Sequence, residues 1–252
     1  MTATSQNVKF TYQDYLHMPE DRRCELIEGE FFMAPRQIPG NLSLMLITDR
    51  NLCKQPFFDT IISALKGGVR AVQLREKGLA TRELYSLAVE LRKITLDFHA
   101  CLIINDRVDI ALAVEADGVH LGWQSLPFGV VRRLLGDERL IGVSTHSREE
   151  VLQAQGLGAD YVTFGPVFDT PSKRGLLVPV GAEMIRSLKD EARLPVIAVG
   201  GINKGNVESV LREGADGIAV ISGILQAADP RTEAVLLCEK IEKFQSLRKE
   251  TS

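Results

Sequence analysis

From residue 42 onward, the chain alternates short runs of apolar, largely β-branched residues with segments of helical periodicity. Segment 81–96 illustrates the helical pattern, because its apolar residues recur at the spacing of one helix face. Continuous apolar runs separated by helices predict a parallel sheet that is covered on both faces. The apolar runs lie at 44–48, 70–74, 101–105, 118–121, 140–143, 161–164, 196–199 and 217–221.

Eight such units predict an α/β fold, a (β/α)8 TIM barrel spanning residues 42–252. An open, doubly wound sheet is the alternative. A repeated unit favours the barrel, because a Gly/Ala-Asp pair three times ends a helical segment and opens a buried run, in 116–122, 158–165 and 214–220. Equivalent units are expected around a ring, so we predict that 42–252 is the catalytic barrel domain.

Residues 1–41 follow a different pattern and predict an N-terminal appendage. We expect helical turns at 11–16, a hairpin about Glu28-Gly29 within 24–33, and a linker at 34–41. Segment 10–35 resembles the start of a restriction-endonuclease-like family, whose members open with the pattern TYxDYLxLPEDxRRYELIDGE. The acidic residues and lysine of such nucleases would follow this segment, where the barrel begins here instead. We therefore interpret 1–41 as a remnant or a docking appendage.

Composition narrows the functional classes. The formal net charge is −3 and both signs are spread along the chain, which argues against nucleic-acid and anionic-membrane partners. No apolar run approaches the roughly 18–20 residues that span a bilayer. The four cysteines stand singly, which argues against disulfides and zinc and predicts a cytoplasmic protein. The histidines lack ligand-like spacing, so a metal would be held by oxygen, and a homo-oligomer is left open.

Polar residues follow the second and third strands. Gln73, Arg75 and Lys77 alternate along the chain and should share one face. Burying them at a barrel mouth is costly without a partner, and an anionic ligand would supply one. A surface salt-bridge face is the alternative. After the third strand, Asp106 is predicted to hold Mg²⁺, while a cap by Asn105 or Asp106 on the helix near residue 108 is the competing interpretation.

Histidines stand at the ends of the fourth and fifth strands. We interpret His120 mainly as a hydrogen-bonded structural residue. His146 lies at a strand end close after Ser144 and is the stronger catalytic candidate. Ser147 and Glu150 have the spacing of a helix capping box.

The loops after the last three strands have the composition of phosphate sites. A long loop after the sixth strand holds hydroxyls and cations suited to clamping a phosphate. Glycines after the seventh strand and a Ser-Gly helix start after the eighth match the phosphate cradle of many barrels. A monophosphate site is therefore predicted here, facing a second anion site with a metal-binding carboxylate over the second and third strands. The residues concerned are Thr170, Ser172, Lys173, Gly200, Gly201, Ile221 and Ser222.

Taken together, these motifs resemble those of the thiamine phosphate synthases over about residues 44–228. The resemblance implies a Mg²⁺-dependent transferase that joins hydroxymethylpyrimidine diphosphate to a thiazole phosphate, both phosphorylated small molecules. The matching segments are LITD at 46–49, VQLREK at 72–77, INDR at 104–107, ADGVHLG at 116–122, GVSTH at 142–146, FGPVF at 164–168, TPSK at 170–173 and VGGI at 199–202.

The resemblance also implies roles for residues at matching positions. Gln73 would read the pyrimidine, Asp106 would bind Mg²⁺, and Ser144 would assist the leaving group. The other implied contacts are Arg75, Lys77, Asn105 and Lys173 for the diphosphate, and Thr170, Ser172, Gly201, Ile221 and Ser222 for the thiazole phosphate.

One departure from the synthase pattern bears on the metal. Synthases continue after His-Leu-Gly with Gln-x-Asp, whose Asp is a second Mg²⁺ ligand, whereas this chain has Ser125 in its place. Ser125 offers only a neutral hydroxyl, so weaker Mg²⁺ binding is expected. Thiazole tautomerases, which act on carboxythiazole phosphate, also tend to carry Ser there and use a histidine in the segment matching 144–146. The retained diphosphate contacts favour the synthase over the tautomerase and over a third alternative, a non-catalytic phosphate-binding barrel.

Overall fold

The computed structural model describes residues 24–27, 30–33, 42–170, 175 and 177–251, and it divides the chain into two compact units, 1–37 and 38–252. In the first unit, β1 (Cys24–Ile27) and β2 (Glu30–Met33) pair antiparallel, with Ile27 opposite Glu30. This confirms the predicted hairpin. The expected helical turns at 11–16 and linker at 34–41 lie outside the described residues.

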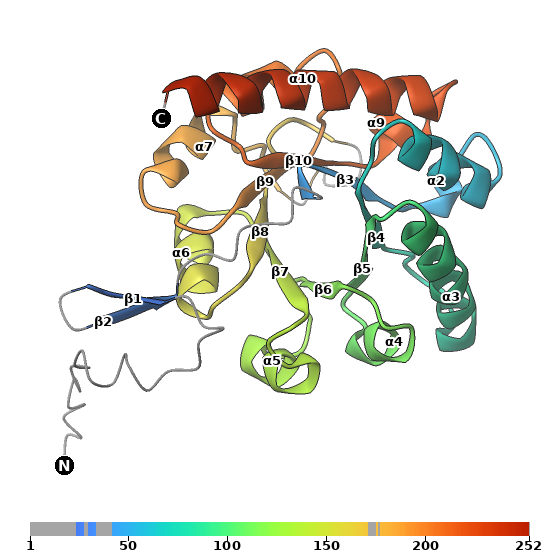
Figure 1. Cartoon of the computed structure of the whole chain (residues 1–252), viewed down its shortest axis with the longest axis horizontal. Helices are drawn as coiled ribbons and strands as arrows, with labels where there is room; N and C mark the ends of the chain where they lie inside the picture. Colours follow the sequence, from blue (N-terminus) through green and yellow to red (C-terminus); the bar gives the residue numbers. More distant parts are fainter. Residues whose placement is uncertain (1–23, 28–29, 34–41, 171–174, 176, 252) are drawn as a thin grey trace. The chain divides into compact units, whose positions relative to one another are not determined.

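In the second unit, eight parallel strands close into a barrel (Figure 1). β10 pairs with β9 on one side and with β3 on the other, which closes the ring and excludes the open sheet. The strands are β3 (Leu44–Ile47), β4 (Ala71–Leu74), β5 (Cys101–Asn105), β6 (Gly118–Leu121), β7 (Leu140–Thr145), β8 (Tyr161–Phe164), β9 (Val196–Val199) and β10 (Gly217–Val220).

The observed strands differ from the predicted ones mainly at β7. The prediction ended this strand at residue 143, but it continues through Ser144 and Thr145. These two residues pair with Thr163 and Phe164 of β8, and the Thr145 hydroxyl donates to the Thr163 carbonyl at 3.1 Å. Partners on the neighbouring strand therefore extend β7 where its own sequence turns polar.

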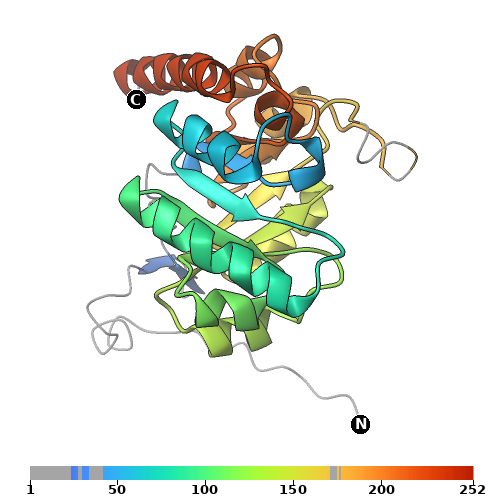
Figure 2. The ribbon, with the colours of Figure 1, turned by 90° about the vertical axis from the view of Figure 1, so that its right-hand side faces the viewer.

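Helices cover the outside of the barrel (Figure 2). α3 confirms the periodicity of segment 81–96, because it buries Leu84, Ala88 and Leu91 on one face. The short helix expected after the eighth strand is α9. The helical elements are η2 (Arg50–Leu52), α2 (Phe57–Lys66), α3 (Thr81–Asp97), α4 (Val108–Ala113), α5 (Phe128–Leu135), α6 (Arg148–Gly156), α7 (Glu183–Lys189), α8 (Val207–Arg212), α9 (Ser222–Leu225) and α10 (Pro230–Thr251). None of the described helices is long and apolar enough to cross a membrane.

The apolar residues form two clusters, one between the strands and the helices and one inside the barrel. The inner cluster mixes large and small side chains, including Met45, Ile103, Tyr161 and Ala219. This packing fills the interior, so the barrel is closed below and only the strand ends offer space for a ligand.

The three repeated Gly/Ala-Asp pairs form one repeated contact at the strand starts, opposite the ends that carry the predicted site. Each aspartate carboxylate accepts from a backbone N–H of the preceding strand and pairs with a cation, and each aspartate N–H donates back to the carbonyl of that same strand residue. The contacts tie Asp117 to Leu102 (2.7 Å) and Arg92 (2.7 Å), Asp160 to Ile141 (2.7 Å) and Arg132 (2.6 Å), and Asp216 to Val196 (2.8 Å) and Lys189 (2.7 Å). The repeat that favoured a ring therefore holds neighbouring strands in register.

Candidate active site

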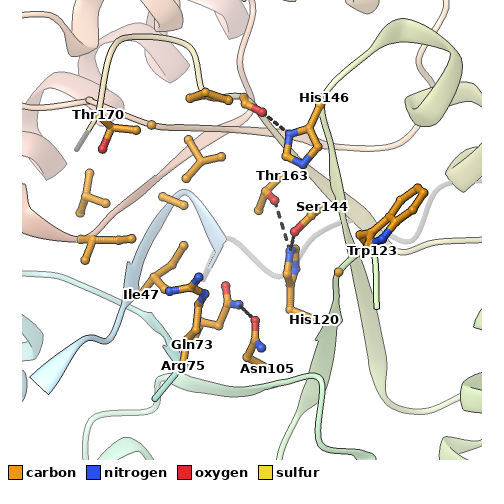
Figure 3. A pocket seen from close by; sticks show the side chains of 18 of the residues that line it. Ile47, Gln73, Arg75, Asn105, His120, Trp123, Ser144, His146, Thr163 and Thr170 are labelled. Atoms are coloured by element: carbon orange, nitrogen blue, oxygen red, sulfur yellow. Dashed lines mark hydrogen bonds between the residues drawn. The ribbon is translucent and has the colours of Figure 1, made fainter. Parts of the chain in front are cut away.

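A cavity of about 350 Å³ opens at the carboxyl ends of the barrel strands (Figure 3). Residues at or beyond the end of every barrel strand contribute to its wall, as expected for a TIM barrel. The lining residues used below are Gln73, Arg75, Lys77, Asn105, Asp106, His120, Trp123, Ser125, Ser144, His146, Thr163, Thr170, Gly200, Gly201, Ile221 and Ser222.

Arg75 places a guanidinium in the wall of this cavity. Its backbone N–H donates to the Thr48 hydroxyl at 3.0 Å, but its guanidinium makes no hydrogen bond or ion pair with the described residues. Partial burial lowers the pKa of Arg75, while the carboxylates of Asp49 and Glu76 act to raise it. Glu76 is occupied by Thr48 and the Arg50 N–H, at 2.7 and 3.1 Å. The guanidinium is thus held in the cavity wall and is available to an anion.

Gln73 and Asn105 form a pair on the same side of the cavity. Gln73 Nε2 donates to Asn105 Oδ1 at 3.0 Å, and Gln73 is 1% exposed. Gln73 Oε1 is buried and lacks a hydrogen-bond partner among the described residues. A buried amide oxygen without a donor is destabilising, so this position favours a ligand that brings an N–H or NH₂ group.

Asp106 lines the cavity in a left-handed backbone conformation, with a φ of 67°. Its N–H donates to the His120 carbonyl at 2.9 Å, which fixes the turn after β5. The alternative that Asn105 or Asp106 caps α4 is wrong, because the cap position is Arg107 and no side chain caps this helix. Asn105 is engaged with Gln73 instead, and the Asp106 carboxylate is exposed toward the cavity.

His120 is buried under the cavity floor, at 2% exposure. Its Nδ1 lies 3.2 Å from the Tyr161 hydroxyl, and its Nε2 lies 2.9 Å from Ser144 Oγ and 3.2 Å from Thr163 Oγ1. Burial, and secondarily the charge of Arg75, lowers the pKa of His120 to about 3. The imidazole is therefore neutral at physiological pH, and its contacts agree with a hydrogen-bonded histidine.

His146 contacts the opposite wall of the cavity. Its Nδ1 bonds the Gly165 carbonyl, so Nε2 remains for the cavity side (Figure 3). The backbone N–H of His146 donates to Glu150 Oε2 at 2.6 Å. Ser147 Oγ accepts from the Glu150 N–H at 3.2 Å and caps α6. The cap is confirmed, although the Glu150 carboxylate returns to His146 and not to Ser147.

The glycines after β9 pack against the loop after β8. Gly200 and Gly201 have positive φ angles, and a Cβ on either would lie 2.6 Å from Pro166 Cα or from the Asp169 carbonyl oxygen, respectively. Only glycine fits both the conformation and the space. The two glycines line the cavity together with Thr170, Ile221 and Ser222, whereas Ser172 and Lys173 lie outside the described residues.

Ser125 is engaged in a turn at the cavity rim. Its Oγ accepts from the Gly122 N–H at 2.7 Å, and its N–H donates to the Gly122 carbonyl at 3.2 Å. This turn carries Trp123, whose side chain is 93% exposed at the mouth of the cavity. No group of three or more His, Cys, Asp or Glu side chains suited to a metal occurs in the described part of the chain.

The structure joins the two predicted anion sites into one cavity. Arg75 and Lys77 line it together with Gly200, Gly201 and Ser222, so residues of both predicted sites share one space. Sequence reasoning gave no role to Trp123 or Thr163. An isolated tryptophan beside a strand-end motif could have indicated Trp123. The position of Thr163 depends on strand register, which the sequence does not show.

Comparison with known proteins identifies the family. Residues 44–224 match the model of the thiamine monophosphate synthase family. A thiamine-phosphate synthase of Syntrophomonas wolfei is 46% identical over 198 residues, which cover 78% of this chain and 95% of that protein. A thiamine-phosphate synthase of Clostridium acetobutylicum is 44% identical over 201 residues, which cover 79% of this chain and 95% of that protein.

Solved structures agree with this relationship. A thiamine phosphate pyrophosphorylase from Pyrococcus furiosus superimposes with a TM-score of 0.75 at 40% identity, covering 81% of this chain and 98% of that one. The matched residues 44–224 include all eight barrel strands and the described residues that line the cavity. The chain belongs to the thiamine monophosphate synthase family.

Proposed function

We propose that this chain is a thiamine-phosphate synthase: it condenses hydroxymethylpyrimidine diphosphate with a thiazole phosphate and releases diphosphate. The observation that carries the proposal is the Arg75 guanidinium, which lines the cavity and forms no hydrogen bond or ion pair with the described residues. The relatives named thiamine-phosphate synthase match nearly their whole length to this barrel. Both substrates are phosphorylated small molecules, so an anion is expected at each side of the cavity.

The chemistry requires charge stabilisation at the leaving group. The bond between the pyrimidine methylene carbon and the diphosphate oxygen breaks with its electron pair on the diphosphate, and the thiazole nitrogen lone pair forms the new C–N bond. Arg75, Lys77 and Lys173 would stabilise the developing negative charge, and Ser144 would donate a hydrogen bond to it. Gln73 Oε1 would accept from the pyrimidine amino group, which satisfies its buried oxygen. No general base is needed.

The donors present fit a magnesium ion that is held largely by the substrate. Mg²⁺ is commonly bound by one or two carboxylates together with phosphate oxygens and waters. Asp106 supplies a carboxylate exposed toward the cavity, and Ser125 faces the same cavity with a hydroxyl. When bound, the ion would neutralise diphosphate charge. Asp106 would hold it there, with its position set by the turn that its N–H makes with His120.

The acceptor phosphate is assigned to the opposite wall. Gly200, Gly201 and Ser222 form an uncharged surface in which backbone atoms can approach a ligand closely. Thr170 and Ser172 would add hydroxyl donors, and Ile221 would contact the ring. Because one cavity contains both walls, the thiazole nitrogen can be held in line with the methylene carbon.

Diphosphate release tests the proposal directly. The full chain is mixed with hydroxymethylpyrimidine diphosphate, thiazole phosphate and Mg²⁺, and diphosphate and thiamine phosphate are measured. We expect equal amounts of both products, and none when either substrate is omitted. A thiazole tautomerase is the second candidate, because it would use a histidine in the segment that contains His146, although His146 by itself does not distinguish the two enzymes. Turnover of carboxythiazole phosphate without diphosphate release would overturn the synthase in favour of it.

A substitution at Ser125 probes the metal. Ser125→Asp adds a carboxylate to the cavity wall that holds Asp106, so the Mg²⁺ concentration for half-maximal activity should fall by about tenfold. Ser125→Asn is the matched control, because it has the same shape without the charge. An unchanged Mg²⁺ requirement in Ser125→Asp would show that residue 125 is remote from the metal.

Trp123 provides a direct report of occupancy, because it is the only tryptophan in the chain. Its indole is 93% exposed at the cavity rim. Adding hydroxymethylpyrimidine diphosphate with Mg²⁺ should shift its fluorescence to shorter wavelength, because the ligand displaces water from the indole. Sulfate at equal ionic strength serves as the control. An unchanged spectrum at saturating substrate would place the ligand elsewhere.

The N-terminal unit is expected to be dispensable for catalysis. The family match begins at residue 44, and residues 38–252 form a separate compact unit. Deleting residues 1–40 should therefore leave kcat for diphosphate release within about twofold of the full chain. A large loss of kcat would show that the appendage contributes to the site.

A further inference from the structure

A row of three residues crosses the barrel interior below the cavity. The strand register places His120 of β6 beside Gly142 of β7, and Gly142 beside Tyr161 of β8. A Cβ on Gly142 would lie 2.1 Å from Tyr161 Cζ, so the missing side chain leaves the space that the tyrosine ring occupies. The Tyr161 hydroxyl thereby reaches His120 Nδ1 across the intervening strand.

The other face of the imidazole meets the cavity hydroxyls. His120 Nε2 lies 2.9 Å from Ser144 Oγ and 3.2 Å from Thr163 Oγ1 (Figure 3). Ser144 and Thr163 both line the cavity. His120 therefore connects a fully buried phenol to a hydroxyl that lines the cavity.

The available hydrogens determine which way these bonds run. His120 is 2% exposed, and its side-chain partners among the described residues are three hydroxyls and no carboxylate, so the site fits a neutral ring with a single hydrogen. Burial raises the pKa of Tyr161, so the phenol keeps its hydrogen. The Tyr161 hydroxyl makes its hydrogen bond with His120 Nδ1, while the Cys101 thiol acts on the phenol electrostatically. A ring hydrogen on Nδ1 would leave the phenol O–H as a buried donor without an acceptor, which is strongly unfavourable.

The phenol must therefore donate to Nδ1, and the ring hydrogen must be on Nε2. Nε2–H then donates to Ser144 Oγ and, at the longer distance, to Thr163 Oγ1. Because Ser144 Oγ accepts from His120 Nε2–H, the hydroxyl hydrogen of Ser144 is free to point into the cavity. In this arrangement the phenol and both ring nitrogens of His120 are satisfied.

We infer that His120 is a positioning residue: Tyr161 holds it as the Nε2–H tautomer, and it in turn orients the Ser144 hydroxyl toward the departing diphosphate oxygen. This inference rests on the proposed synthase function. Ser144 keeps its proton in this arrangement. It donates a hydrogen bond to the diphosphate oxygen, and this bond strengthens as negative charge develops there.

A double-mutant cycle tests the inference in the full chain. Tyr161→Phe preserves the ring but removes the donor to Nδ1. The ring hydrogen of His120 can then move to Nδ1, which leaves Nε2 as an acceptor next to Ser144. We expect kcat for diphosphate release to fall about tenfold with nearly unchanged KM, as for the loss of one transition-state hydrogen bond. In a Ser144→Ala background, Tyr161→Phe should have no further effect on kcat. Thr95→Val, which removes another buried hydroxyl in α3, is the control and should leave kcat unchanged.

Nitrogen NMR of the ¹⁵N-histidine-labelled chain reads the tautomer without turnover. The His120 signals are assigned by their loss in His120→Gln, and we expect a protonated Nε2 and an unprotonated Nδ1. A protonated Nδ1, or an equal kcat loss for Tyr161→Phe with and without Ser144, would overturn the inference. Absence of diphosphate release by the wild-type chain would instead refute the proposed function, while the NMR result would still locate the ring hydrogen.

Discussion

Arg75→Met should reduce kcat for diphosphate release by about 10²–10³-fold, the cost of removing one preorganised donor at a developing negative charge. The Arg75 guanidinium lines the cavity and makes no ion pair with the described residues, so its removal should leave the fold intact. Methionine retains the unbranched apolar stem of the side chain without the guanidinium. Steady-state kinetics with both substrates would measure the loss, and the thermal midpoint would confirm folding.

Two further variants make the Arg75 result specific. Arg75→Lys keeps the charge but loses the planar pair of donors, so it should recover part of the activity. Arg82→Met removes an exposed arginine on α3 and should leave kcat unchanged. Activity of Arg75→Met within tenfold of wild type would contradict a role for Arg75 at the leaving group.

Asp160→Ala should lower the free energy of unfolding by about 3 kcal/mol, a value in the range for breaking a buried ion pair. The Asp160 side chain is 7% exposed and accepts from the Ile141 N–H and from Arg132. Its loss leaves both donors without their carboxylate at the junction of β7 and β8. Arg132 keeps bonds to the carbonyls of Gly136 and Arg139, which moderates the cost. Urea unfolding measures the change.

The equivalent aspartate of another repeat provides the control. Asp117 makes the same contacts but its side chain is 34% exposed, so Asp117→Ala should cost less than Asp160→Ala. Asp160→Asn keeps an acceptor for the backbone N–H and should fall between wild type and Asp160→Ala. If the two alanine variants were equally destabilised, burial would not set the strength of this contact.

The barrel could be predicted because its determinants are local. Each strand is an apolar run. The Gly/Ala-Asp repeat, which indicated a ring, places an aspartate that hydrogen-bonds to the start of the preceding strand. The extension of β7 through Ser144 and Thr145 could not be predicted in this way, because it depends on pairing with β8. A polar pair at the end of a run looks the same whether the strand continues or stops.

The site was predictable in part for the same reason. Gln73, Arg75 and Lys77 all line the cavity as predicted, but β4 ends at Leu74, so strand alternation accounts only for Gln73, and Arg75 and Lys77 lie in the loop that follows. The network of His120 with Tyr161 depends on the register of three strands and on the missing side chain of Gly142. Ser125 matched a metal-ligand position in the motif, and only the folded turn shows that its hydroxyl also accepts from Gly122. The roles of the site residues stay predictions.

A crystal structure of the full chain with thiamine phosphate, diphosphate and Mg²⁺ would test most directly whether one cavity holds both phosphorylated groups. We expect diphosphate against Arg75, Lys77 and a metal on Asp106, with the thiamine phosphate group against Gly200, Gly201 and Ser222. Diphosphate bound away from Arg75, or the two anions in separate cavities, would contradict it.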